Sequence, residues 1–171
     1  MKIPAATVYK ALLKWGQEAL GLPAGKVRRA YQDNSPAPFP YPFAYFSIVS
    51  IQRSSTNAEN FILDPVTGTA SGSQEASMML TAQLDIYGPQ CTDLAQAAEL
   101  HFRSPLGTGF FAPYGLSPCY STPPTILSGA RDEKGNWGER ATMRLIFNLT
   151  QSISYPTDYF ADPELEVIPL T

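Results

Sequence analysis

Residues 75–106, EASMMLTAQLDIYGPQCTDLAQAAELHFRSPL, decide the fold of this chain. The first half of this stretch alternates strictly between apolar and polar side chains. Its apolar positions are Ala76, Met78, Leu80, Ala82, Leu84 and Ile86, and Ser77, Thr81, Gln83 and Asp85 lie between them. A period of two residues over this length is typical of a long strand that is packed on one face only.

The second half of the stretch has the period of a helix. The change comes at Gly88-Pro89, which interrupts the strand pattern. The side chains expected to face the core then recur every three or four residues, at Leu94, Ala97, Ala98, His101 and Phe102. A long strand that leads into a compact helix, with no catalytic residue in either, suits a scaffold for assembly better than an enzyme.

The flanking segments complete an α+β pattern. An amphipathic helix is expected over residues 5–22, with Thr7 as its N-cap. Residues 43–52 are expected to form a strong strand at the centre of the sheet, because apolar side chains occupy both of its faces. Further strands are expected at residues 26–32, 115–121, 125–130 and 138–154, and the rest of residues 107–124 is expected to be irregular.

These elements predict one domain over residues 1–171. Its fold class is α+β, with a mixed or antiparallel sheet of four to five strands that is flanked by two helices. Two extended segments leave this frame, an excursion at residues 53–74 and a C-terminal tail at residues 155–171.

The excursion at residues 53–74 is polar and exceeds an ordinary connection, whose median is about 4–6 residues. Inside it, the apolar triplet Phe61-Ile62-Leu63 precedes a turn signal at Asp64-Pro65. The pattern favours a protruding loop or hairpin. Either the triplet contacts another molecule or it folds back onto its own core, and the sequence leaves both readings open.

Composition excludes several classes of function. The 171-residue chain has a formal net charge of −3, which argues against an electrostatic grip on nucleic acid. Lys26, Arg28 and Arg29 form one short basic cluster, which a solvated strand face explains as well. No window holds the roughly 20 apolar residues that span a bilayer, and the N-terminus lacks the apolar core of a signal peptide. A soluble protein made in the cytoplasm, without a membrane partner, is expected.

The sequence offers no acid, base or nucleophile with a catalytic motif around it. His101 is the only histidine, and we expect it to be structural and hydrogen-bonded. Asp85, Asp93 and Glu99 lie near the junction of strand and helix, but capping and the helix dipole explain acids at a helix start more simply.

The two cysteines, Cys91 and Cys119, lack the spacing of a zinc site. We expect reduced thiols, and the sequence leaves a disulfide open. The prediction is therefore no catalytic residue, no cofactor and no metal.

The central stretch resembles a family of tailed-phage neck and tail-terminator (tail-completion) proteins. In that family a strand that ends in LD-[VI]-[YH]-GP is followed by a helix that closes with F-R-S. Here the corresponding segments are Leu84-Asp85-Ile86-Tyr87-Gly88-Pro89 and a helix with Asp93, Ala95 and Phe102-Arg103-Ser104. The resemblance continues through residues 110–112, 115–118, 137–151, 159–161 and 165–167. The excursion at 53–74 is longer than the family pattern, and residues 121–136 match it poorly.

The resemblance implies a structural virion protein of the phage neck or tail. Such proteins form a ring, expected here to be a homo-hexamer, that caps the tail tube, ends its polymerisation and joins the tail to the head connector. The implied partners are copies of this chain, the tail tube protein and connector or adaptor proteins. Genomic DNA would pass through the lumen without sequence-specific binding.

Two segments are candidates for contacts with other subunits or with the tube. They are Phe61, Ile62, Leu63 and Asp64 in the excursion, and Leu165, Val167 and Ile168 in the tail. Two other functions are alternatives to that of a tail terminator. One is another neck connector, such as a head-completion or adaptor protein. The other is a small-molecule or carbohydrate-binding module that uses the aromatic residues of segments 38–46 and 110–120.

Overall fold

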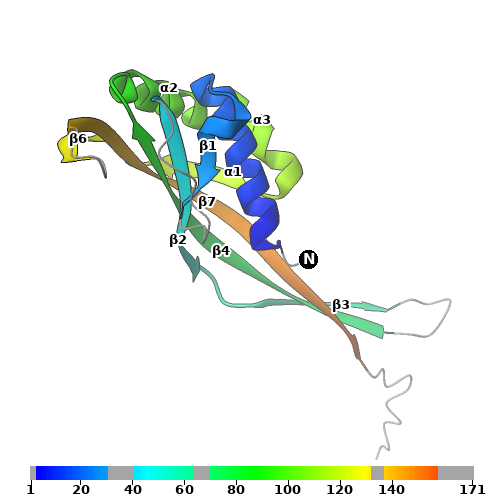
Figure 1. Cartoon of the computed structure of the whole chain (residues 1–171). Coiled ribbons are helices and arrows are strands. Elements are labelled where there is room, and N and C mark those ends of the chain that lie inside the picture. Colours follow the sequence, from blue (N-terminus) through cyan, green and yellow to red (C-terminus); the bar gives the residue numbers. More distant parts are fainter. Residues whose placement is uncertain (1–2, 31–40, 64–69, 132–136, 158–171) are drawn as a thin grey trace, which may run out of the picture.

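The computed structural model of the chain describes residues 3–30, 41–63, 70–131 and 137–157 (Figure 1). Its helices are α1 (Ala5–Leu20), α2 (Cys91–Arg103) and α3 (Pro105–Phe111), with 3-10 turns η1 (Ala24–Lys26) and η2 (Ala112–Tyr114). Its strands are β1 (Val27–Arg29), β2 (Phe43–Arg53), β3 (Ala58–Leu63), β4 (Ala70–Tyr87), β5 (Ser117–Ser121), β6 (Thr125–Arg131) and β7 (Trp137–Thr157). No helix in these described segments is long and apolar enough to cross a membrane.

The strands form one mixed sheet in the order β1-β2-β4-β7-β5, with β3 paired to β4 and β6 paired to β7. The β1–β2 pair is parallel, and the other pairs are antiparallel. This confirms the α+β class and the mixed sheet. Strand β2 does not lie at the centre of the sheet, because β1 pairs with only three of its residues and no other described strand pairs with that edge. The described sheet has seven strands, more than the expected four to five. Apolar alternation does not reveal β3, because its apolar residues are consecutive and main-chain pairing with β4 holds the strand in place.

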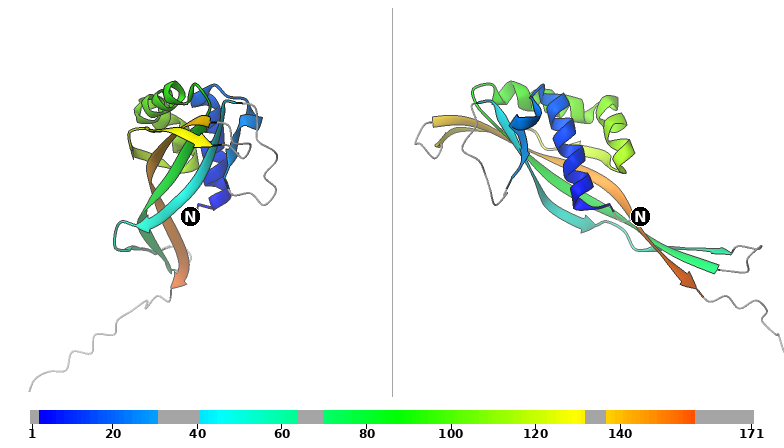
Figure 2. Two further views of the ribbon diagram at one scale, coloured as in Figure 1. Left: turned by 60° about the vertical axis from the view of Figure 1, so that its left-hand side comes forward. Right: turned by 45° about the vertical axis from the view of Figure 1, so that its right-hand side comes forward.

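All three helices lie on one face of the sheet (Figure 2). The core fills the space between them, and β4 lies at its centre with Leu80, Ala82, Leu84 and Ile86 fully buried. The antiparallel register places Phe46 of β2 and Met143 of β7 on either side of Leu84. From the helices, the core receives Val8, Leu12, Trp15, Ala95, Ala98, Phe102 and Phe111. The predicted inward face of the long strand is therefore confirmed.

Helix α1 and strand β1 are both shorter than expected. Gly21 adopts a left-handed conformation, φ 62°, and ends α1 at Leu20 rather than at residue 22. The N-cap is Pro4 and not Thr7, since the Thr7 N–H donates to the Pro4 carbonyl at 2.9 Å. Strand β1 pairs with β2 over three residues only, where the sequence predicted a strand over residues 26–32.

Helix α2 is rotated relative to the expected stripe. Its buried residues are Cys91, Ala95, Ala98 and Phe102, whereas Ala97 is exposed. The period was predicted correctly, but alanine spacing alone does not fix which of several alanines faces the sheet.

Helix α3 is a third helix, in a segment that was expected to be irregular. The Ser104 side chain accepts a hydrogen bond from the Gly107 N–H at 3.4 Å, and Pro105 occupies the first turn. A Cβ on Gly107 would lie 2.6 Å from the carbonyl oxygens of His101 and Phe102. Helix α3 can therefore follow α2 directly only with glycine at this position.

Gly16 allows α1 to approach the sheet closely. A Cβ at this position would lie 2.6 Å from Cε2 of the fully buried Phe46. Alanine gains about 1 kcal/mol of helix propensity over glycine, but overpacking a core costs roughly 1–3 kcal/mol. We expect Gly16→Ala to lower the free energy of unfolding by about 1 kcal/mol in urea denaturation. Gly25→Ala, whose Cβ would meet nothing within 4 Å, is the control. A more stable Gly16→Ala protein would contradict this close approach.

Candidate interaction surface

The sheet continues beyond the helices as a three-stranded arm (Figure 1). We define the arm as β3, residues 70–75 of β4 and residues 152–157 of β7. Its register is continuous, because Leu63 pairs with Ala70 and Ala70 pairs with Thr157. The excursion at 53–74 is thus a protruding hairpin, and β7 adds a third strand to it.

Hydrogen bonds fix the base of the arm where β2 passes into β3. The Ser54 N–H donates to the Ser77 carbonyl at 2.9 Å, and the Ser77 N–H donates to Ser55 Oγ at 3.1 Å. One step further out, Gln74 Nε2 donates to Glu59 Oε1 at 2.6 Å. These polar residues therefore attach the link between β2 and β3 to the middle strand of the arm.

One face of the arm carries exposed apolar side chains. Phe61 is 63% exposed and Ile153 is 69% exposed. Phe61 lies opposite Gly72, and Gly72 lies opposite Tyr155, so Phe61, Tyr155 and, two residues earlier, Ile153 share this face. Along β7 the same face includes the buried Leu149. The arm therefore extends the core-facing side of the sheet into a region that none of the described helices covers.

Gly72 is needed in the middle of the arm. A Cβ at this position would lie 2.6 Å from the ring of Tyr155 on β7. Glycine lets that ring lie across the central strand, where it covers the backbone that a side chain would otherwise shield.

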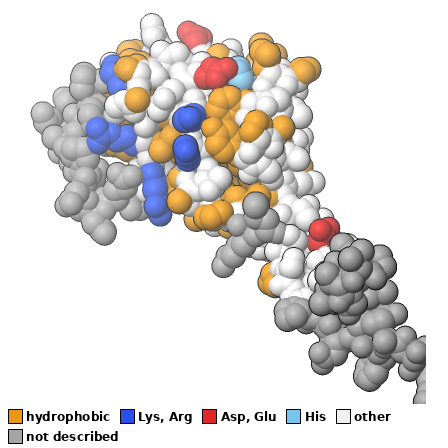
Figure 3. Space-filling view, turned by 90° about the vertical axis from the view of Figure 1, so that its right-hand side faces the viewer, with side chains coloured by type: hydrophobic (Ala, Val, Ile, Leu, Met, Phe, Trp, Pro, Cys, Tyr) orange, Lys and Arg blue, Asp and Glu red, His pale blue; other side chains and the backbone are white. Residues whose placement is uncertain are grey.

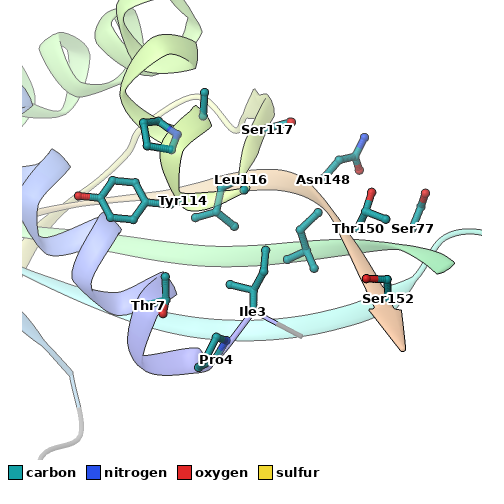
Figure 4. Close-up of a pocket in the computed structure, with 14 residues that line it drawn as sticks. Ile3, Pro4, Thr7, Ser77, Tyr114, Leu116, Ser117, Asn148, Thr150 and Ser152 are labelled. Carbon is teal, nitrogen blue, oxygen red and sulfur yellow. The ribbon is translucent and has the colours of Figure 1, made fainter. Parts of the chain in front are cut away.

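A groove of about 820 Å³ opens at the foot of the arm (Figure 4). Ile3 and Leu116 lie in its middle, and Ser77, Thr150 and Ser152 lie along the side where β4 and β7 lead into the arm. None of its described lining residues is charged. The groove is therefore suited to an apolar or neutral polar segment rather than to an ion.

The same region contains an open sheet edge. Strand β5 pairs with β7 only as far as the Ser117–Asn148 pair. Among the described strands, none pairs with this edge of β7 from Leu149 onward, and none pairs with the outer edge of β3. Such edges are templates on which a further strand can add.

The face of the sheet without helices carries a buried polar network. Asp85 is 7% exposed, and its Oδ1 accepts a hydrogen bond from Arg140 Nη2 at 2.8 Å. Gln83 Nε2 donates to both carboxylate oxygens, at 3.0 and 3.2 Å. The Arg140 guanidinium also lies 5.4 Å from the centre of the Tyr87 ring. A carboxylate held in this way is structural, because its charge is already neutralised.

The three acids that the sequence placed near one another do not form a site. Asp85 pairs with Arg140, Glu99 pairs with Arg103 at 3.0 Å, and Asp93 lies in the first turn of α2. Among the described residues, no cluster of three or more His, Cys, Asp or Glu side chains could hold a metal ion.

The expectation of a hydrogen-bonded histidine is confirmed. Trp15 Nε1–H donates to His101 Nδ1 at 3.0 Å. In the neutral imidazole the proton therefore resides on Nε2, which lies 4.0 Å from Glu18 Oε1.

Both cysteines are free thiols, as expected. Cys91 is buried at the start of α2 and Cys119 is exposed on β5. Burial raises the pKa of the Cys91 thiol, which keeps it protonated and unreactive at neutral pH.

Several aromatic residues behind the binding-module alternative pack against one another or into the core, whereas Tyr120 is 53% exposed. Phe43 stacks between Tyr41 and Tyr87, with ring centres 5.5 and 4.9 Å apart. Phe111 lies 4.8 Å from Phe147 within the core. These rings are therefore used for internal packing.

The arm contains part of the predicted contact set. Phe61 is exposed on β3, and Ile62 and Leu63 belong to the same strand. Asp64, Leu165, Val167 and Ile168 lie outside the described residues. Neither Ile153 nor the groove was predicted from the sequence. Ile153 continues the alternation of β7, so this pattern could have identified it, whereas the groove is formed by segments distant in sequence.

Comparison with known proteins identifies a family that matches this chain. No curated protein matches this chain. The model of a family described as phage neck terminator protein matches residues 6–169, nearly the whole chain. Members of such a family are structural proteins of the virion neck, and the arm, groove and open edges described above suit contacts with other proteins. The chain therefore belongs to the phage neck terminator protein family.

Proposed function

We propose that this protein forms a closed ring, a homo-hexamer, that caps the tail tube, ends tube polymerisation and joins the tail to the head connector. The observation that carries the proposal is the arm, whose exposed Phe61 and Ile153 extend the core-facing side of the sheet beyond the helices. Apolar surface of this kind is typical of contacts between proteins.

A ring follows from this geometry if the arm of one copy contacts a different surface of the next copy. Repetition of such a heterologous contact closes into a ring when the rotation between subunits allows it. The groove at the foot of the arm and the open edge of β7 supply a second surface of suitable character. In the assembled neck, the tube protein and the connector proteins are the other partners, and DNA passes through the lumen without sequence-specific contacts.

Deletion of residues 56–72 is expected to leave a folded protein that cannot set tail length. The deletion removes β3 and Phe61 but keeps the hydrogen bond between Ser55 and Ser77, so residues 73–76 can close a shorter hairpin. We expect a normal circular dichroism spectrum, loss of rings and tails of abnormal length in negative-stain images. Tails of normal length with this variant would refute the role of the arm.

A matched pair of double variants separates the arm from other exposed apolar residues. Phe61→Ser with Ile153→Ser changes two residues of the arm. Leu100→Ser with Leu106→Ser changes two residues that are 75% and 70% exposed on α2 and α3. Only the first pair is expected to prevent ring formation, as measured by light scattering and on isolated tubes. If only the variant with Leu100→Ser and Leu106→Ser failed to form rings, the contact would lie on the helices instead.

A further inference from the structure

We call α1, α2, α3 and the part of the sheet that they cover the head of the subunit. A basic surface occupies one side of this head. It consists of Lys10 and Lys14 on α1, Lys26 in η1, and Arg28 and Arg29 on β1. Glu18 is the only acid in residues 3–30, although the whole chain has a net charge of −3. Figure 3 shows Lys and Arg side chains gathered on this side of the head. We call these five residues the basic face.

The basic face is held together by contacts between α1 and β1. The Arg29 guanidinium lies 4.2 Å from the centre of the Tyr9 ring on α1, and Lys26 Nζ donates to the Tyr41 carbonyl at 3.4 Å. Lys10 and Lys14 are exposed and one helical turn apart, an arrangement in which like charges repel. Within the described part of the chain, the ion pairs involve His101, Arg103 and Arg140 and not these lysines. An anionic partner would relieve the repulsion.

The chain itself contains a segment of complementary charge. Residues 158–171, DYFADPELEVIPLT, contain Asp158, Asp162, Glu164 and Glu166 and no lysine or arginine. The segment also carries the apolar residues Leu165, Val167 and Ile168. No other segment of this length in the chain combines four acids with no base.

This segment follows the far end of the arm in the chain. The last described residue, Thr157, lies at the end of the arm (Figure 1). From Asn148 to Thr157 the strand advances about 30 Å, at about 3.3 Å per residue. Fourteen further residues span at most about 50 Å. This length is sufficient to reach the head of a neighbouring subunit in a ring.

We propose that residues 158–171 of one copy bind the basic face of a neighbouring copy. This inference rests on the proposed ring, and it assigns the ring a second contact besides the arm. The acids pair with Lys10, Lys14 and the arginines of β1, and opposite charges at the margin of an interface fix its register and speed its formation. Since Lys10, Lys14 and Arg29 are exposed, salt screens the contact.

The test uses a fluorescent peptide of residues 158–171 and the full chain with a neutral tail. In this protein the four acids of residues 158–171 are replaced by amides, so that the segment does not compete with the peptide. The substitutions are Asp158→Asn, Asp162→Asn, Glu164→Gln and Glu166→Gln. We expect saturable binding by fluorescence anisotropy at low salt. Adding Lys10→Glu and Lys14→Glu, or using the peptide with four amides, should weaken binding at least about tenfold. Arg144→Glu is the matched control for Lys14→Glu alone. Arg144 is exposed on β7 and lies outside the basic face, so the Arg144→Glu protein should bind the peptide with unchanged affinity. Absence of binding, or equal loss with Arg144→Glu, overturns the proposal.

Two further measurements exclude other occupants. If the monomeric chain with its native residues 158–171 does not bind the peptide, these residues occupy the basic face of their own copy and the proposal is wrong. If a short DNA duplex binds through Lys10 and Lys14 while the peptide does not bind, the face serves DNA instead. Negative-stain images of tubes decide the ring separately. If the chain with the neutral C-terminal segment forms rings equally well, the contact of residues 158–171 is refuted but the ring is not. If the peptide binds and no rings form, only the proposed ring is refuted.

Discussion

Leu84→Asp is expected to abolish soluble folding. Leu84 is fully buried on the central strand β4, between Phe46 and Met143 in the register. Removing a buried leucine side chain costs roughly 2–5 kcal/mol, and an unpaired buried carboxylate adds several kcal/mol more. The sum approaches the total stability of a typical domain, about 5–15 kcal/mol. We expect the variant in the insoluble fraction of an expression test.

Ser77→Asp is the control for this substitution. Ser77 lies on the same strand, but its side chain is exposed, so a carboxylate there remains hydrated. This control should be soluble, with a circular dichroism spectrum like that of the parent. If Leu84→Asp were equally soluble and equally folded, the inward orientation of this face of β4 would be wrong.

Trp15→Ala is expected to remove about 3–5 kcal/mol of stability. Trp15 is fully buried on α1 and joins the helices to the sheet, with ring centres 6.2 Å from Phe46, 5.8 Å from Phe102 and 5.7 Å from Phe111. The substitution leaves a cavity among these rings and deprives His101 Nδ1 of its donor at 3.0 Å. Urea denaturation followed by circular dichroism measures the loss.

Trp15→Phe separates packing from hydrogen bonding. This variant keeps an aromatic ring in the core but has no N–H for His101. We expect it to lose less stability than Trp15→Ala, roughly 1–3 kcal/mol. If Trp15→Ala cost less than about 1 kcal/mol, which is typical of a surface substitution, the central position of Trp15 in the core would be contradicted.

The long strands and the first helix could be predicted because each carries a complete local pattern. The alternation from Ala76 to Ile86 and the stripe of α1 both record which face meets the core. The glycine that ends α1 was also visible, since Gly21 supplies the left-handed conformation. The class of fold follows from these elements.

Other features depend on contacts between distant segments. Ala95 and Ala97 are chemically identical, and only the position of α2 over the sheet decides that Ala95 is buried. Helix α3 contains two glycines and one proline, which oppose a helix prediction, yet the close approach of Gly107 to the end of α2 requires this arrangement. Strand β3 exists because β4 offers it a free edge.

The candidate surface shows the same division. The triplet that includes Phe61 was found from sequence as an apolar group within a polar excursion. Its position on an arm beside Ile153, above a groove at the foot of the arm, required the pairing of β3, β4 and β7. The basic cluster at residues 26–29 was visible, but Lys10 and Lys14 join it only because α1 packs beside β1.

The sequence by itself thus determined the elements whose side chains repeat with the period of a strand or a helix, the α+β class and the likeness to neck terminators. Tertiary structure alone decided which surfaces are assembled from segments far apart in the chain. The physical reason is that periodicity records burial within one element. The arm, the groove and the basic face depend on pairing and packing between elements, and no local pattern encodes them.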